Sequence, residues 1–404
     1  METRPRIYDS IVSEHLATLR QMVFLSGPRQ VGKTTVAENA ADLYLNWDEE
    51  ADRRQILAGS ATIDAALAQA GTGENTGKPP VVVFDEIHKY ALWKRFVKGF
   101  FDTHEKRLKV IVTGSARMNI YKRGGDSMMG RYFPYRVHPW SVAECLHTDI
   151  PPDDAFIRPP EKISDEDWDA LQRHGGFPEP FLRRDPRFTG RWRMTRLEQL
   201  AREDLREVSR VQDLGSLETF MHLLGARSAG QLVFANLAAE MNVSVNTIKS
   251  WTDLFTRLYH GFLVRPWFAN VSKALRKAPK WFLSDWSGIE DAGARAETFA
   301  ACHLLKAVEG WTDLGFGSFE LRYLRDKMKR EVDFLIVRDK KPWCLVEVKS
   351  GDAPLSPALA HFQAQTKAKH AFQLNFARPF EAVDCFQHTS PVIVPARTFL
   401  SQLL

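Results

Sequence analysis

The chain has 404 residues, and its 55 lysines and arginines exceed its 50 aspartates and glutamates by enough to give a formal net charge of +5. A chain of this length is expected to form two or three domains, since one domain usually has about 100–200 residues. The mildly basic charge permits contact with nucleic acid but does not indicate it by itself. No apolar run reaches the length of a membrane span and the first residues lead into no signal region, so we expect a cytoplasmic protein without a membrane partner. The four cysteines show no C-x-x-C spacing, which indicates neither a zinc site nor a disulfide framework.

A predicted strand at residues 22–25 is followed by the phosphate-loop pattern G-x-x-x-x-G-K-[ST] at residues 27–34, and a helix can begin at Thr34. The glycines let backbone N–H groups curl around phosphate oxygens, and the helix N-terminus adds the positive end of its dipole. We expect Lys33 to reach the β- and γ-phosphates of ATP and Thr34 to bind Mg²⁺. The predicted nucleotide-binding residues are Gly27, Pro28, Arg29, Gln30, Val31, Gly32, Lys33, Thr34 and Thr35.

The second motif is the run VVVFDE at residues 81–86. Its continuous apolar part predicts a strand buried on both faces of a parallel sheet. Two carboxylates end this strand at the edge where open α/β sheets bind their ligands. This is a Walker B pattern, in which Asp85 would hold Mg²⁺ and Glu86 would act as the general base on the attacking water.

A third apolar run at residues 109–115 predicts another buried strand with a polar tip. Ser115 is the predicted sensor of the γ-phosphate, and Thr113 is the alternative. Arg131 is the predicted arginine finger, given to the nucleotide of a neighbouring subunit, and Arg117 is its competitor. A finger that acts between subunits implies a homo-oligomer.

A stretch rich in proline and aspartate at residues 148–163 predicts the end of the first domain, and helical patterns follow it. Residues 236–251 then match a helix-turn-helix, with Asn236 as the expected cap of the first helix. Asn242 suits the turn and Ser244 the cap of the second helix. The exposed face of that second helix, which enters the major groove in a DNA reader, would carry Asn246, Thr247, Lys249 and Ser250.

Two predicted strands at residues 259–264 and 280–283 would form the wing of a winged helix. The loop between them has a basic character that suits phosphate contacts, through Lys273, Arg276, Lys277 and Lys280. A winged helix that contacts protein, or that packs against the ATPase, is the alternative.

The last third of the chain predicts a hairpin of two strands, residues 331–337 and 344–349. Glu347 and Lys349 point to one face because side chains alternate along a strand, and Asp333 on the partner strand can meet them. Carboxylates with a lysine can bind Mg²⁺ and activate water for phosphodiester cleavage. The alternatives are cross-strand ion pairs on a solvated face, or a fold that binds without cleaving.

These motifs together resemble the AAA+ ATPases, and more narrowly the bacterial and archaeal group in which the AAA module is followed by a poorly characterised C-terminal module. The resemblance extends from about Arg6 to about Phe376. Its segments are GPRQVGKTT at 27–35, VVVFDEIHK at 81–89, VTGSAR at 112–117, GRYFPYRVHPWSVAE at 130–144 and GGFPEP at 175–180. The C-terminal hairpin resembles the core of the PD-(D/E)XK nucleases, and Glu297 on the preceding helix matches that fold's additional acidic position.

The expected fold is therefore α/β, with a P-loop AAA+ parallel-sheet core at residues 1–150, a helical lid or linker at 151–215, a winged helix-turn-helix at 216–288 and a PD-(D/E)XK nuclease-like domain at 289–404. The expected function is Mg²⁺-dependent ATP hydrolysis that acts on DNA. The alternatives are an ATP-dependent switch that binds a protein partner, and an ATP-gated nuclease.

Overall fold

The computed structural model describes residues 4–69, 78–114, 128–153, 155–200, 214–267 and 278–404. The chain divides into two compact units, Met1–His138 with His147–Ile150, and Pro139–Leu146 with Pro151–Leu404. This differs from the expected four domains, because the residues after Pro151 fold as one unit. No helix among the described ranges combines the length and the apolar character that crossing a membrane requires.

The first unit is built on a five-stranded sheet of order β2-β3-β4-β1-β5, in which every neighbouring pair is parallel. The three strands predicted from apolar runs are confirmed as β1, β3 and β4. The strands are β1 Met22–Ser26, β2 Leu43–Asn46, β3 Val81–Asp85, β4 Lys109–Gly114 and β5 Tyr132–Arg136. All five residues of β3 are buried, as expected of a strand covered on both faces.

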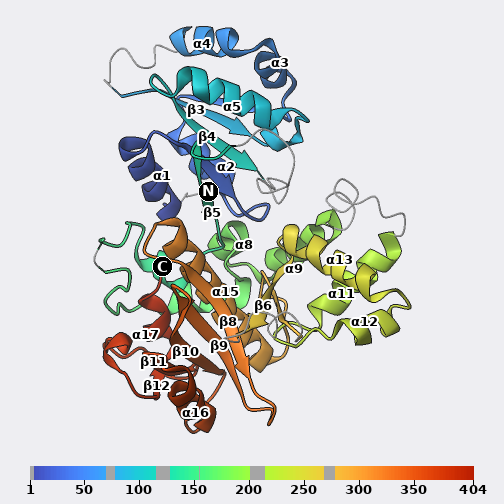
Figure 1. Cartoon of the computed structure of the whole chain (residues 1–404), viewed down its shortest axis with the longest axis vertical. Helices are drawn as coiled ribbons and strands as arrows, with labels where there is room; N and C mark the ends of the chain where they lie inside the picture. Colours follow the sequence, from blue (N-terminus) through green and yellow to red (C-terminus); the bar gives the residue numbers. More distant parts are fainter. Residues whose placement is uncertain (1–3, 70–77, 115–127, 154, 201–213, 268–277) are drawn as a thin grey trace. The chain divides into compact units, whose positions relative to one another are not determined.

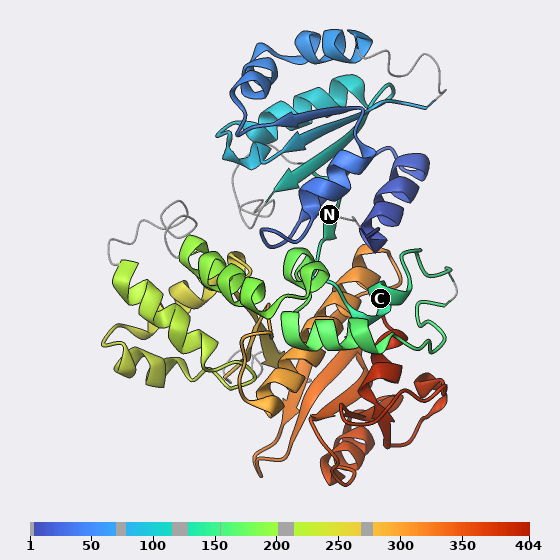
Figure 2. The same cartoon turned by 180° about the vertical axis from the view of Figure 1, so that it is seen from behind.

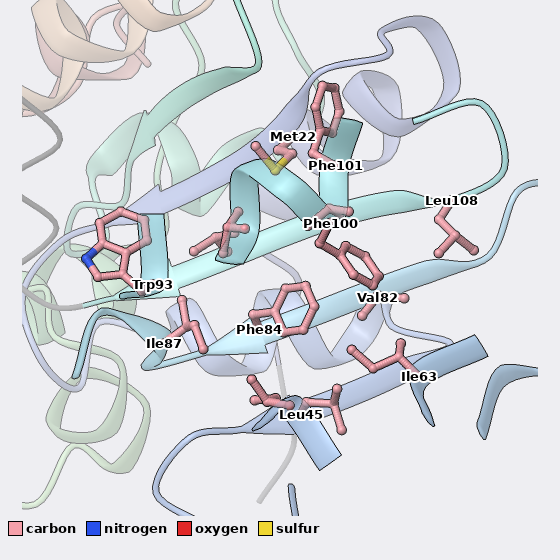
Figure 3. Packing of buried hydrophobic residues seen from close by; sticks show 14 of the residues in the cluster. Met22, Leu45, Ile63, Val82, Phe84, Ile87, Trp93, Phe100, Phe101 and Leu108 are labelled. Carbon is pink, nitrogen blue, oxygen red and sulfur yellow. The ribbon is translucent and has the colours of Figure 1, made fainter. Parts of the chain in front are cut away.

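Helices cover both faces of this sheet (Figure 1). They are α1 Ile7–Thr18, α2 Lys33–Ala40, α3 Glu50–Ala58, α4 Ser60–Gln69 and α5 Trp93–His104, with a short 3₁₀ turn at Ile87–Lys89. The apolar side chains of α5 recur at helical spacing and so form one stripe. Figure 3 shows Phe100 of this stripe beside Phe84 of β3, and the two rings meet edge to face at 5.2 Å. Burial of one such ring contributes about 1.5–3 kcal/mol, so this face is a main source of the unit's stability.

The second unit is built on a seven-stranded mixed sheet of order β12-β11-β10-β9-β8-β6-β7. The strand pairs β10–β9, β9–β8 and β6–β7 are antiparallel. The pairs β6–β8, β10–β11 and β11–β12 are parallel. The strands are β6 Gly261–Pro266, β7 Lys280–Leu283, β8 Phe319–Arg325, β9 Glu331–Arg338, β10 Lys341–Lys349, β11 His370–Asn375 and β12 Val392–Pro395. Since β6 pairs with β8, the expected boundary at residues 288 and 289 cuts through one continuous sheet.

Helix α15, Ala292–Asp313, packs against β8, β9 and β10, and Figure 2 shows it in orange along the strands. Helix α16, Pro357–Thr366, packs against β9, β10 and β11. The other helices of the unit are α6 Val142–Leu146, α7 Asp165–His174, α8 Pro178–Arg183, α9 Pro186–Gln199, α11 Leu214–Gly225, α12 Phe234–Glu240, α13 Val245–Arg257 and α17 Ala396–Ser401, with a 3₁₀ turn at Cys385–Gln387.

One buried ion pair ties α15 to the segment that enters this unit. The ammonium of Lys306 on α15 donates to the carboxylate of Glu144 on α6 and to the carbonyl of Pro139, the latter at 3.1 Å. The two charged side chains are 2% and 0% exposed, so each neutralises the other's charge within the core.

Candidate functional site

The phosphate loop lies between β1 and α2, the strand–loop–helix context that its pattern predicts. The backbone geometry at the two glycines of the pattern explains why glycine is required there. A Cβ on Gly27 would lie 2.3 Å from the carbonyl oxygen of Val137, and Gly32 has a φ of 98°, a left-handed conformation that other residues rarely adopt. Lys33 is buried and its Nζ donates to the carbonyls of Gly27 and Pro28, at 3.0 and 2.6 Å. The loop therefore encloses an ammonium group at the N-terminus of a helix.

Burial lowers the pKa of Lys33 to about 8, although the Glu86 and Asp85 carboxylates act in the opposite direction. A cation held in a buried, partly desolvated position has a strong electrostatic preference for an anion. The arrangement therefore suits a polyphosphate.

Asp85, the last residue of β3, is the meeting point of three hydroxyl groups. Thr34 donates to its Oδ2 at 3.2 Å, Tyr44 on β2 donates to the same oxygen, and Thr113 on β4 donates to Oδ1. Parallel strands end at one edge of the sheet, which is why side chains so far apart in sequence converge here. Tyr44 was not foreseen from the sequence. Tyr44 lies in the short strand β2, and nothing in the sequence places that strand beside β3. The structure does so, for example through the pairing of Asn46 with Asp85.

Glu86 follows Asp85 in a left-handed conformation, with a φ of 52°, which turns the chain sharply away from the strand. Its side chain is 22% exposed, and its Oε2 lies 3.7 Å from Nε2 of His88 and 3.8 Å from Nζ of Lys89. Burial raises the pKa of Glu86, and the Lys33 charge lowers it. A partly desolvated carboxylate beside the loop is a group that can accept a proton from water.

Of the other predicted residues of this site, Ser115 and Arg117 lie outside the described residues. Thr113, the alternative sensor, is fully buried and bonded to Asp85. Arg131 precedes β5, and the pairing of Tyr132 with Met22 puts it near the N-terminal end of the sheet, opposite to the edge that carries Lys33. Its guanidinium forms two hydrogen bonds with Asp102 of α5, at 2.6 and 3.0 Å.

The segment predicted to be a helix-turn-helix forms two helices of the second unit, α12 and α13. Asn242 in the turn has a φ of 52°, and the hydroxyl of Ser244 accepts a hydrogen bond from the backbone N–H of Thr247 at 3.1 Å, as predicted. The expected cap Asn236 is wrong, since α12 begins at Phe234 and is capped by Val233. Asn246, Lys249 and Ser250 are exposed, whereas Thr247 is half-buried.

Strands β6 and β7 form the predicted antiparallel hairpin after this motif, with Gly261 opposite Leu283. Lys273, Arg276 and Lys277 of the predicted basic loop lie outside the described residues. Lys280 was expected in that loop, but the structure corrects this: it is the first residue of β7 and is buried.

The four residues predicted from the C-terminal hairpin come together on α15, β9 and β10. Lys349 donates to Glu347 at 2.8 Å, and the backbone N–H of Val348 donates to Asp333 at 2.9 Å. Glu297 of α15 joins them through Lys280, whose Nζ donates to Glu297 at 2.8 Å and to Asp333 at 3.1 Å. Burial, and then the neighbouring Asp333 carboxylate, raise the pKa of Glu347 and bring that of Glu297 to about 8.

Comparison with known proteins identifies the first unit's core. Residues 19–146 match the model of an AAA domain. Two further segments match domains of unknown function, DUF8612 over residues 165–289 and DUF4143 over residues 292–382. Neither description bears on a winged helix or a nuclease.

Uncharacterized proteins of Mycobacterium bovis and Mycobacterium tuberculosis are each 22% identical to the chain over 269 residues, or 65% of this chain and 54% of the relative. The chain thus spans about half the length of these curated relatives. Among solved structures, the ORC1 protein of Aeropyrum pernix in complex with DNA has a TM-score of 0.32 at 12% identity, with 74% of this chain and 94% of that chain covered. AMPPCP-bound DnaA from Aquifex aeolicus has a TM-score of 0.28 at 12% identity, with 60% and 85% covered.

The AAA domain's own residues fit ATP and Mg²⁺. The enclosed Lys33 ammonium and the glycine-lined loop suit phosphate oxygens, and a Cβ at Gly27 would disrupt the loop. The hydroxyl of Thr34 and the carboxylate of Asp85 are hard oxygen donors that meet at one point, which is the donor set that Mg²⁺ prefers.

Proposed function

We propose that the AAA domain binds ATP with Mg²⁺ and hydrolyses it. The observation that carries this proposal is the hydrogen bond of Thr34 to Asp85 at 3.2 Å, beside the enclosed ammonium of Lys33. This hydrogen bond joins the phosphate-loop motif to the acidic end of β3, although Thr34 and Asp85 are 51 positions apart in the sequence.

Each residue has a distinct part in this proposal. Lys33 exchanges the carbonyls of Gly27 and Pro28 for phosphate oxygens, while Thr34 and Asp85 hold the metal. When bound, Mg²⁺ neutralises phosphate charge and so favours attack by water. Glu86 accepts the proton of that water, and its low exposure keeps it poorly solvated and therefore more basic than a free carboxylate.

Steady-state phosphate release tests the proposal. We expect the wild-type chain to hydrolyse ATP with Mg²⁺ and to stop when EDTA is added, because the metal is part of the site. Binding of a fluorescent ATP analogue, measured in the same preparation, separates a failure to bind from a failure to react. A folded chain that binds no nucleotide contradicts the proposal at its first step.

The second proposal is that the ATPase acts on DNA. It is supported by the α12–α13 pair, by the β6–β7 hairpin that follows it, and by the exposure of Asn246, Lys249 and Ser250 on α13. Asp253 and Arg257 are also exposed on this helix, so its surface carries charges of both signs.

Hydrolysis rates with duplex, single-stranded and branched DNA distinguish the candidates. Stimulation by one form supports action on DNA and identifies the substrate. A rate indifferent to every form favours the alternative, an ATP-dependent switch that binds a protein partner. The double variant Lys249→Ala, Asn246→Ala should lose DNA stimulation and keep the basal rate, and exposed Glu50→Gln in the first unit is a matched surface control.

The meeting of Glu297, Asp333, Glu347 and Lys349 supports the resemblance of the C-terminal module to the PD-(D/E)XK nucleases. Lys280 in their midst argues against cleavage by this module. We therefore propose a binding role for it and no nuclease step.

A further inference from the structure

Lys280 lies at the centre of the C-terminal carboxylates. Its Nζ is 2.6 Å from Oε1 of Glu331, 2.8 Å from Oε1 of Glu297 and 3.1 Å from Oδ1 of Asp333. An ammonium group has three N–H donors and no acceptor, so three carboxylates use its full capacity. The side chain is 4% exposed, which means that water takes little part in solvating the charge.

The strand holds this ammonium in place. Lys280 pairs with Val264 across the β6–β7 hairpin, and its Nζ also lies 5.7 Å from the centre of the Tyr323 ring on β8. Burial alone would lower the pKa of Lys280, but the nearby Asp333, Glu297 and Glu331 carboxylates raise it above its ordinary value. The neighbouring carboxylates therefore favour the charged form of Lys280.

Some of the other oxygens of this acidic cluster also have partners, whereas Oε2 of Glu347 is buried and makes no hydrogen bond with the described residues. Oδ2 of Asp333 accepts the backbone N–H of Val348, Oε2 of Glu331 pairs with Arg325 at 2.8 Å, and Oε1 of Glu347 pairs with Lys349 at 2.8 Å. Among the described residues, no set of three or more His, Cys, Asp or Glu side chains is arranged to hold a metal ion. Glu297, Glu331 and Asp333 thus already share the Lys280 ammonium, and Glu347 is paired with Lys349.

We propose that Lys280 is the resident cation of this cluster and excludes divalent metal ions from it. A metal ion bound by Glu297, Glu331 and Asp333 would have to displace the Lys280 ammonium from three carboxylates, and separating a buried charge from its partners is costly. The inference is independent of ATP hydrolysis, because every residue in it lies in the second unit. It makes the C-terminal module a metal-free one.

Mn²⁺ binding to the full chain without nucleotide tests this, with free Mn²⁺ measured by electron paramagnetic resonance. We expect the wild type and Glu347→Gln to bind equal numbers of ions, because Glu347 holds none. Lys280→Ala should gain one site, since removal of the ammonium leaves four carboxylates close together. Lys280→Ala combined with Glu347→Gln should weaken that site at least about tenfold, and Lys280→Arg should gain none because it keeps the charge.

Two results would overturn the proposal. The first is that the wild-type chain binds a Mn²⁺ ion that the Glu347→Gln or Asp333→Asn variant does not bind. This comparison remains decisive even if Lys280→Ala fails to fold. The other is a folded Lys280→Ala chain, checked by circular dichroism, that gains no ion. Metal-dependent nicking of DNA by the wild type, abolished in Glu347→Ala, would overturn it as well.

Discussion

The phenol of Tyr44 on β2 donates a hydrogen bond to the Asp85 carboxylate on β3, at the same oxygen that accepts the hydroxyl of Thr34. Asp85 is buried, so its orientation depends on these donors and little on water. In the proposed site this is the carboxylate that holds Mg²⁺, and Tyr44 is a positioning residue for it.

Tyr44→Phe should lower kcat for ATP hydrolysis by about 3- to 10-fold while the Kd for nucleotide stays the same. A hydrogen bond to a charged group is worth about 1.5–3 kcal/mol, and part of it would be lost from the geometry of Asp85. Tyr90→Phe is the matched control, because Tyr90 stacks on Trp47 through its ring and the substitution keeps the ring. A larger Kd with unchanged kcat would assign Tyr44 to nucleotide binding instead.

Glu86→Gln should bind ATP and hydrolyse it about 10²–10⁴ times more slowly, because an amide cannot accept the proton of the attacking water. Lys33→Ala should lose nucleotide binding itself. Equilibrium binding and single-turnover hydrolysis measured on both variants separate the two roles. A Glu86→Gln chain that turns over at the wild-type rate would make the general-base assignment wrong.

Arg131 and Asp102 allow a test of the proposed finger. Their ion pair is exposed and worth no more than about 1 kcal/mol, so neither substitution should unfold the chain. Arg131→Ala should slow hydrolysis only at protein concentrations where the chain assembles, whereas Asp102→Asn should not slow it, because the guanidinium is then released for a neighbour. Equal losses in both variants, independent of concentration, would show a local structural role.

Lys306→Met should destabilise the second unit by about 3–5 kcal/mol, since it removes the ammonium that pairs with the buried Glu144 carboxylate. Adding Glu144→Gln should recover part of this loss. Urea unfolding measures both. Arg173→Met, which removes an exposed pair with Asp169, is the control and should change stability by less than about 0.5 kcal/mol.

His303 predicts a pH dependence of stability. Burial lowers its pKa to about 3, whereas an unfolded histidine titrates near 6.5, so below pH 6.5 protons bind the unfolded chain and not the folded one. Stability is therefore complete above pH 6.5 and falls as pH drops toward 3, with a loss of about 2 kcal/mol from this residue at pH 5. His303→Leu should show a smaller difference in unfolding free energy between pH 8 and pH 5. His260, whose pKa burial also lowers to about 3, remains in both proteins and cancels in the comparison.

The sequence predicts a helix, strand or turn well where that element depends on interactions between residues close together in the chain. The apolar runs at β1, β3 and β4, the left-handed turn at Asn242 and the cap at Ser244 all depend on residues within a few positions of each other. The pairing of Lys349 with Glu347 follows from strand alternation alone. Asn236 fails because α12 begins at Phe234 after Val233, whose side chain makes no capping hydrogen bond, so a polar cap does not set the start of this helix.

By itself the sequence determined the phosphate loop, the acidic end of β3 and the presence of an α/β core, because each follows from a short run of residues that favours one backbone conformation. Only the tertiary structure decided which side chains complete the two sites. Tyr44 reaches Asp85 because β2 pairs with β3 in the sheet. Lys280 on β7 reaches Glu297 on α15 and Glu331 and Asp333 on β9, although β6 and β8 lie between β7 and β9 in the strand order. Strand order depends on long-range pairing, and a residue's neighbours across a sheet leave no signature in the spacing of the chain.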